Sequence, residues 1–99
     1  MKQRVLLRPQ ARDEMADAAR WYREKSPLIA IAFREAIRRT ISQISERPAS
    51  FPQIANGIHR ALTRRFPYAI FFAVEGPVVV VLAIKQQAQD PATWPTNAN

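Results

Sequence analysis

The chain has 99 residues, 47% of them hydrophobic, which is enough for one domain with a single core and too few for two domains. It contains no cysteine and one histidine, which excludes disulfides and argues against a zinc site. Fifteen Lys and Arg against eight Asp and Glu give a formal net charge of +7, which favours an anionic partner such as nucleic acid or an acidic protein.

A short strand and a helix are predicted at the start of the chain. Lys2 to Arg8 is β-prone around Val5-Leu6-Leu7 and stops at Pro9, which suits the first turn of a helix. From Pro9 to Glu24, apolar residues recur at helical spacing, so we expect them to form one apolar stripe. They are Ala11, Met15, Ala18, Trp21 and Tyr22.

Ser26 and Pro27 mark the joint between two helices. Proline disfavours helix at the residue before it, so Ser26 is expected to end the first helix and to cap a second one, Pro27 to Glu46. The apolar stripe of the second helix is Ile29, Phe33, Ala36, Ile37, Ile41 and Ile44. Because almost nothing separates them, the two helices are expected to form an antiparallel hairpin.

The charged residues of the second helix lie largely off its apolar stripe. Arg34, Arg38 and Arg39 are interpreted as a solvated face, and Glu35 is placed to pair with Arg38 or Arg39. If these arginines face a partner instead, the helix hairpin becomes part of the interface.

Ala49 to Gly57 predicts a loop, because it contains Pro52 and the pair Asn56-Gly57. It also carries two large apolar residues, Phe51 and Ile54. We expect both of them to pack against the helix ends.

Ile58 to Phe66 predicts a strand that carries a cluster of arginines. Arg60 and Arg64 share the parity of the apolar residues in this strand, so one strand face mixes apolar and cationic side chains. A bulge near Arg64-Arg65 would resolve this mixture.

Two further strands follow. From Tyr68 to Val74, alternate residues form a large apolar face and a smaller one. Glu75-Gly76-Pro77 predicts a tight turn. The next strand, Val78 to Lys85, is apolar throughout its length before the lysine, which is typical of a central strand covered on both faces.

Residues 86–99 predict a polar tail on a single domain that spans residues 1–99. Trp94 is the anchor of this tail and is expected to pack back on the domain, whereas Asn97-Ala98-Asn99 is expected to fray. The longest uncharged apolar run, Val78 to Ile84, is far shorter than the roughly 20 residues needed to span a bilayer, and the start lacks a signal-peptide pattern. We therefore expect a soluble, cytoplasmic protein with no membrane partner.

The element order β-α-α-β-β-β predicts an α+β fold. We expect an antiparallel sheet with the two-helix hairpin packed on one face. The first strand is expected to join at an edge of the sheet or beside the last strand.

Four segments of the chain carry a family resemblance. They are the basic strand, Arg65-Phe66-Pro67-Tyr68-Ala69-Ile70-Phe71-Phe72, the valine-rich strand and Asp90-Pro91-Ala92-Thr93-Trp94. Together they resemble the RelE/ParE superfamily of type II toxin–antitoxin toxins, and the long helices make the chain more similar to the ParE branch. The resemblance implies a small basic toxin that needs no cofactor, is held inactive by a cognate antitoxin and serves in plasmid stabilisation.

The resemblance leaves three functions open. The ParE branch implies a toxin that inhibits DNA gyrase by binding to it. Such a toxin is itself not an enzyme. The RelE branch implies a ribosome-dependent mRNA endoribonuclease. A third alternative is a toxin-derived module without toxicity, acting only as a co-repressor through its antitoxin.

Residues for ribonuclease chemistry can be assigned only in part. Such chemistry needs a base, a cation that stabilises the phosphorane and an acid for the leaving oxygen. The resemblance implies that RelE-like nucleases carry His, Tyr or Arg on and just after the last strand, where residues 85–89 here read Lys-Gln-Gln-Ala-Gln. Arg60, Arg64 and Lys85 remain the candidate catalytic cations of the nuclease alternative.

Three other residues are candidates for the acid or the base. His59 and Glu75 could act as a base and Tyr68 as an acid. The interpretation favoured here is structural for all three: His59 as a partly exposed residue at a strand start, Tyr68 as a core or rim residue, and Glu75 as a solvated turn residue.

A binding role is predicted for the cationic cluster of Arg60, Arg64, Arg65 and Lys85. Arginine binds carboxylates and phosphates with two hydrogen bonds, so these side chains are candidates for contacts to the target or to the antitoxin. The antitoxin segment is expected to be acidic with apolar anchors and to fold on binding, at a sheet edge or in a helix groove.

Overall fold

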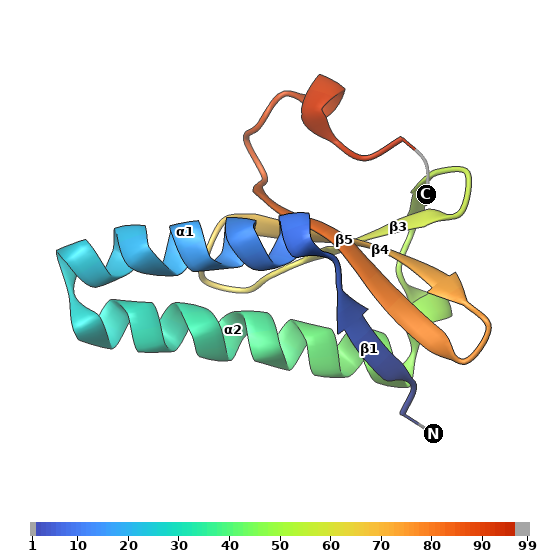
Figure 1. Cartoon of the computed structure of the whole chain (residues 1–99), viewed down its shortest axis with the longest axis horizontal. Helices are drawn as coiled ribbons and strands as arrows, with labels where there is room; N and C mark the ends of the chain where they lie inside the picture. Colours follow the sequence, from blue (N-terminus) through green and yellow to red (C-terminus); the bar gives the residue numbers. More distant parts are fainter. Residues whose placement is uncertain (1, 97–99) are drawn as a thin grey trace.

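Two long helices lie against one face of a five-stranded sheet in the computed structural model, which describes residues 2–96 (Figure 1). In chain order the elements are β1 (Arg4–Leu7), α1 (Pro9–Lys25), α2 (Pro27–Glu46), the 3-10 helix η1 (Pro48–Ser50), β2 (Gln53–Ala55), β3 (Ile58–Leu62), β4 (Tyr68–Glu75), β5 (Val78–Gln86) and the 3-10 helix η2 (Pro91–Thr93). None of the described helices is long and apolar enough to cross a membrane. The expected fraying of residues 97–99 lies outside the described residues.

The predicted elements are confirmed in their order, but the structure adds the strand β2 and one strand pairs in parallel. The strand order is β1-β5-β4-β3-β2, and β2 to β5 pair antiparallel, whereas β1 pairs with β5 in parallel, with Arg4 opposite Val78. The sheet is therefore mixed rather than antiparallel throughout. Only strands joined by a tight turn are forced to pair antiparallel, and no turn joins β1 to β5.

Residues 49–57 are more regular than the predicted loop. Gln53–Ala55 forms β2, which pairs with β3 through a turn at Asn56 and Gly57, where Gly57 has φ +78°. A strand of three residues is too short to show the alternation by which strands are recognised in a sequence.

The strand predicted to reach Phe66 ends earlier, at Leu62. Residues 63–67 form a turn instead of the expected bulge, and Arg65 in this turn has φ +72°. The bulge in this part of the sheet lies between Phe71 and Phe72 in their pairing with β5. The sequence therefore predicts correctly that the strand is interrupted near Arg64-Arg65. The interruption is a turn and not the predicted bulge.

The main core lies between the helices and the sheet. Phe33, Ile37 and Ile44 of α2 are fully buried against Ile70 and Phe72 of β4. Two residues of the predicted stripes do not belong to this core, because Trp21 is 54% exposed and Ile29 is 42% exposed. Both lie near the joint of the hairpin, whose tip projects past the sheet in Figure 1.

A smaller core lies on the opposite face of the sheet. Phe71 and Ile58 are fully buried there, and Trp94 from the tail packs over Phe71 with ring centroids 5.4 Å apart. The predicted anchoring role of Trp94 is confirmed. Ile54 also packs on this face and not against the helix ends, whereas Phe51 packs into the main core.

Candidate binding site

An open groove runs along α2, on the side that faces the turn after β3. Its volume is about 360 Å³. One wall is the outer side of α2 and the other is the end of β3 with the following turn. The lining residues are Leu28, Ile31, Ala32, Glu35, Ala36, Arg39, Thr40, Gln43, Leu62, Arg64 and Arg65.

The helix wall contains Leu28 and Ile31, which point away from the core, beside Ala32 and Ala36, which also pack against the main core. Leu28, Ile31 and Ala32 follow one another at helical spacing, and Ala36 continues the row one turn later. Leu28 is 77% exposed and Ile31 is 63% exposed, so the described structure leaves these side chains in solvent. Leu62, at the end of β3, is an exposed apolar residue on the opposite wall.

The second wall depends on a turn that Thr63 holds in place. The buried Thr63 hydroxyl donates to the carbonyl oxygen of Phe66 at 2.5 Å, and the Thr63 N–H donates to the carbonyl oxygen of Tyr68 at 3.0 Å. The Tyr68 N–H in turn donates to the carbonyl oxygen of Phe66 at 2.8 Å. These bonds fix the backbone from which the exposed Arg64 and Arg65 extend to the groove.

The four predicted binding cations do not form one cluster. Arg64 and Arg65 line the groove, but Arg60 lies on the sheet face away from the helices, with its guanidinium carbon 5.1 Å from the centre of the Trp94 ring. The side-chain Nε of Arg60 and the indole nitrogen of Trp94 are both buried without a hydrogen-bond partner among the described residues. Alternation along β3 and the turn after it explain why Arg60 and the other two arginines separate.

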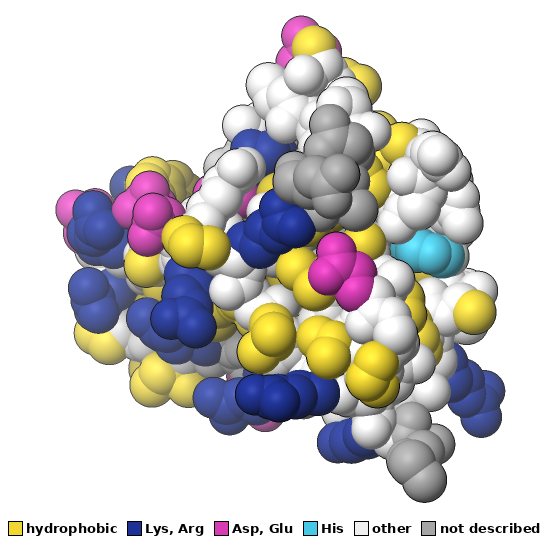
Figure 2. Space-filling view, turned by 45° about the vertical axis from the view of Figure 1, so that its right-hand side comes forward, with side chains coloured by type: hydrophobic (Ala, Val, Ile, Leu, Met, Phe, Trp, Pro, Cys, Tyr) yellow, Lys and Arg dark blue, Asp and Glu magenta, His cyan; other side chains and the backbone are white. Residues whose placement is uncertain are grey.

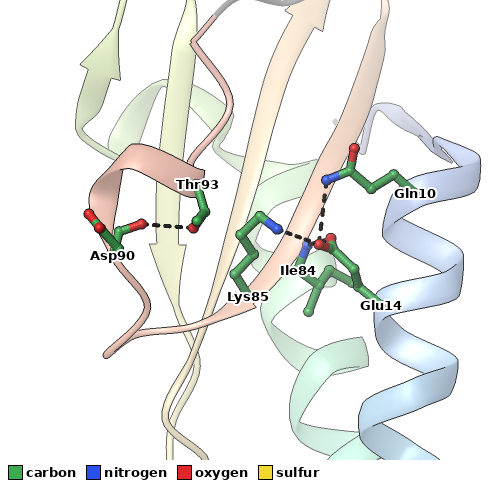
Figure 3. A network of polar contacts seen from close by, with 6 residues as sticks. All are labelled: Gln10, Glu14, Ile84, Lys85, Asp90 and Thr93. Carbon is green, nitrogen blue, oxygen red and sulfur yellow. Dashed lines mark hydrogen bonds and ion pairs between the residues drawn. The ribbon is translucent and has the colours of Figure 1, made fainter.

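Lys85 is held in an ion pair, as Figure 3 shows. Its Nζ lies 2.6 Å from the Oε2 of Glu14 in α1, and 11% of the Lys85 side chain is exposed. Glu14 also accepts a hydrogen bond from the backbone N–H of Ile84 at 2.9 Å. The role of Glu14 is not predicted from the sequence, because its partners lie about 70 residues away along the chain and no local pattern joins them.

The arginines of the groove are not neutralised inside the described part of the chain. No ion pair there involves Arg39, Arg64 or Arg65, whereas Glu35 pairs with Arg38 at 3.2 Å, as predicted. Figure 2 shows lysine and arginine side chains gathered on the helix side and along the lower edge, with apolar side chains between them. The groove therefore combines exposed apolar surface with uncompensated positive charge.

The sequence matches the family model of the ParE toxin of type II toxin–antitoxin systems over residues 5–91. The chain belongs to this family. Its fold is similar to a chain of the chromosomal ParDE toxin–antitoxin system from P. aeruginosa, with a TM-score of 0.75, 16% identity, and coverage of 86% of this chain and 96% of that one. It is also similar to a chain of the RelBE2 toxin–antitoxin complex from Mycobacterium tuberculosis, with a TM-score of 0.59, 15% identity, and coverage of 87% and 99%. No curated protein matches the sequence.

In this ParE-family chain, His59 has a structural environment. Its Nδ1 lies 2.8 Å from the carbonyl oxygen of Phe51, and its ring stacks on Phe72 with centroids 5.2 Å apart. These contacts support the interpretation of His59 as a structural residue and place the ring between the start of β3 and the core.

Tyr68 and Glu75, the other two acid or base candidates, also have structural environments. Tyr68 is 6% exposed and packs among Tyr22, Phe33 and Phe66 in the main core. Burial, together with the adjacent Tyr68 hydroxyl, raises the pKa of Tyr22, so its phenol stays protonated to higher pH than usual. Glu75 is exposed at the turn between β4 and β5.

Proposed function

We propose that this ParE-family toxin inhibits DNA gyrase by binding to it and that a cognate antitoxin neutralises the toxin. Family membership supports a toxin of this type. The observation that carries the proposal is the groove. Its exposed leucine and isoleucine side chains lie beside three arginines that form no ion pair among the described residues, which suits recognition of an acidic protein surface. Gyrase as target places the working protein in the cytoplasm, and the whole chain acts as one domain.

The positions of the predicted cations favour binding over catalysis. Arg64 and Arg65 contribute to the groove, while Arg60 contacts Trp94 and Lys85 pairs with Glu14. A nuclease built on Arg60, Arg64 and Lys85 would need these three side chains around one phosphate. Binding roles for Arg60 and Lys85 stay predictions, and Arg64 and Arg65 are the stronger candidates.

A supercoiling assay tests the proposed target. Purified gyrase, relaxed plasmid and ATP are incubated with the toxin at micromolar concentration, with heat-unfolded toxin as the control. Inhibition by the folded toxin alone is expected. Unaffected supercoiling would overturn gyrase as the target.

The ribonuclease alternative is kept as the second candidate, because the chain also shares its fold with a chain of the RelBE2 toxin–antitoxin complex. Translation reactions with mapped mRNA ends separate it from gyrase inhibition, because a ribosome-dependent nuclease leaves new transcript ends inside the reading frame. Growth arrest with intact transcripts would remove this alternative. Induced expression that leaves growth unchanged would instead support a module without toxicity.

A further inference from the structure

We propose that a hollow between the start of β1 and the second half of α2 binds the phosphate backbone of duplex DNA. The volume of this hollow is about 460 Å³, and it shares Glu35 and Arg39 with the groove. The choice of DNA as the nucleic acid rests on the proposed function, because DNA is the substrate of gyrase. The phosphate site itself rests on the side chains that line the hollow.

The hollow forms where the first residues of the chain dock on the end of α2. The backbone N–H of Gln3 donates to the carbonyl oxygen of Ser45 at 2.9 Å. This bond holds the segment before β1 against the last turns of α2, so that the exposed Lys2 lines the same hollow as Ser45. The two walls are therefore positioned by the fold, although they come from opposite ends of the first half of the chain.

Positive charge in the hollow is not neutralised. Lys2, Arg38 and Arg39 line it, and Glu35 is the acidic residue among the lining residues, so their net charge is 3 − 1 = +2. Glu35 lies 3.2 Å from Arg38, but both side chains are more than half exposed, which makes this ion pair weak. No ion pair within residues 2–96 involves Lys2 or Arg39. The hollow is therefore a place that attracts an anion.

Hydroxyl groups lie beside these cations. Ser42 and Ser45 are about one helical turn apart on α2, on the side of the helix that also carries Arg38. Proteins hold the phosphates of DNA with arginine and lysine side chains together with serine hydroxyl groups. The donors that line the hollow are therefore of the kinds that bind a phosphate.

The hollow lacks the apolar surface that a protein partner would need. None of the exposed large hydrophobic residues in the described part of the chain lines it, and its Val5 and Ile41 pack against the main core. The centre of a protein interface requires buried apolar or aromatic side chains, which the groove can supply through Leu28 and Ile31. Charge and hydroxyl groups without such side chains are typical of contacts to a nucleic-acid backbone.

The surface around the hollow is extended as well as basic. α2 and β1 lie along the lower edge of the molecule in Figure 1, and Figure 2 shows lysine and arginine side chains along that edge. Duplex DNA carries one negative charge per about 1.7 Å of its axis, so an extended edge meets several phosphates. If Lys2, Arg38 and Arg39 each neutralise one phosphate, the logarithm of affinity falls against the logarithm of salt concentration with a slope of about −3.

Fluorescence anisotropy of a short labelled DNA duplex tests the binding. The full-length toxin is titrated in about 50 mM NaCl, with unlabelled duplex or polyglutamate of equal charge as the competitor. We expect polyglutamate to compete at least about tenfold less well than the duplex. Equal competition would overturn phosphate recognition, and absence of binding at about 100 µM toxin would overturn the site. Tighter binding of an RNA duplex of the same sequence would overturn the choice of DNA.

Variants outside the groove localise the site. Lys2→Gln and Arg38→Gln each remove one cation of the hollow, and each is expected to weaken DNA binding about threefold to tenfold and to lower the salt slope by about 1. Arg23→Gln is the matched control on an exposed residue of α1 that does not line the hollow, and it should change the affinity less than about twofold. Circular dichroism checks that the variants fold. Equal losses in all three variants would show attraction to the net charge alone and contradict the proposed site.

A variant that should bind more tightly gives a test in the opposite direction. Glu35→Gln removes the acidic group of the hollow and releases Arg38 from its ion pair, so we expect the affinity for the duplex to rise about threefold. Glu24→Gln makes the same charge change on an exposed residue of α1 and should raise the affinity less than about 1.5-fold. An unchanged affinity in Glu35→Gln, or an equal rise in both variants, would contradict the site.

Failure of this inference can be told from failure of the proposed function. The anisotropy measurements contain no gyrase, so a toxin that does not bind DNA but still inhibits supercoiling would reject the phosphate site and leave the proposed function standing. A toxin that binds DNA through Lys2 and Arg38 but leaves supercoiling unaffected would reject gyrase as the target and leave the phosphate site standing.

Discussion

At the residue scale, the environment of Lys85 shows how a distant partner changes the role of a cation. Its ammonium group lies 2.6 Å from Glu14, and the two side chains are 11% and 22% exposed. A carboxylate this far from water is stabilised by the donors that surround it, here Lys85 and the N–H of Ile84. Lys85 therefore joins the end of β5 to α1, which makes it a structural residue as well as a predicted binding residue.

Replacing Lys85 with methionine is expected to destabilise the fold. Lys85→Met leaves the Glu14 carboxylate without its cation, and we expect a loss of about 2–3 kcal/mol in the free energy of unfolding. Urea unfolding followed by circular dichroism measures this loss. Arg20→Met is the control, because it breaks an exposed pair with Asp17 that is worth about 0.5 kcal/mol or less. Equal effects of the two variants would show that the Lys85 pair is as weak as a surface pair.

A second prediction at this scale concerns Arg65. Arg65→Gly removes the strain of a positive φ, which is worth about 1–2 kcal/mol, and adds roughly 0.5–1 kcal/mol of chain entropy to the unfolded state. We therefore expect a gain of about 0.5 kcal/mol in stability together with weaker inhibition of gyrase, because Arg65 lines the groove. Arg64→Gly, at a position without a positive φ, should only lose stability. A clear loss in Arg65→Gly would mean that the contact between Arg65 and the Phe66 ring supports the fold.

At the scale of elements, α2 presents two rows of apolar residues to two different environments. One row packs into the main core through Phe33, Ile37 and Ile44, and the other, with Leu28 and Ile31, remains exposed along the groove. A helix needs only one apolar side to pack on a sheet. The second row is therefore not explained by folding and is available to a partner.

The tail after β5 is an element with a single large contact. Trp94 covers Phe71 and the Arg60 guanidinium, so Trp94→Ala is expected to lower the free energy of unfolding by about 2–3 kcal/mol. Thermal and urea unfolding measure the change. Trp21→Ala is the matched control, because Trp21 is 54% exposed. Removing its side chain should lower the free energy of unfolding by less than about 1 kcal/mol. If the two tryptophan variants are equally stable, the tail does not stabilise the sheet face that lies away from the helices.

At the scale of the whole molecule, charge and fold act together. The net charge of +7 attracts any anionic partner at long range, whereas the exposed apolar side chains of the groove distinguish an acidic protein surface from other polyanions. The exposed cations are screened by salt, but the apolar contacts are not. The free energy of binding should therefore contain one contribution that depends on salt concentration and one that does not.

A salt titration measures these two contributions. We expect the affinity of a synthetic peptide of glutamates and leucines, a model of an acidic protein surface, to fall about tenfold between about 50 and 300 mM NaCl and then to level off, because the apolar contacts persist. Duplex DNA should lose nearly all its binding over the same range. Parallel loss of both ligands would show that charge alone drives the association.

The sequence determined the two helices and four of the five strands, because each of these is encoded by local spacing and by proline or glycine near its ends. Pro9 and Pro27 mark the helix starts, and the valine run predicts β5 as a strand buried on both faces. It also predicted the anchoring of Trp94 and the Glu35–Arg38 pair, and the family resemblance followed from the same segments.

Tertiary structure alone decided which of the predicted cations lie together. Arg60 and Arg64 are four residues apart, yet the alternation of β3 and the turn at residues 63–67 send them to different surfaces. Lys85 pairs with Glu14, about 70 residues away along the chain, and the groove lies where α2 meets the end of β3. Contacts between distant segments depend on how the elements pack, and no local pattern in the chain records that packing.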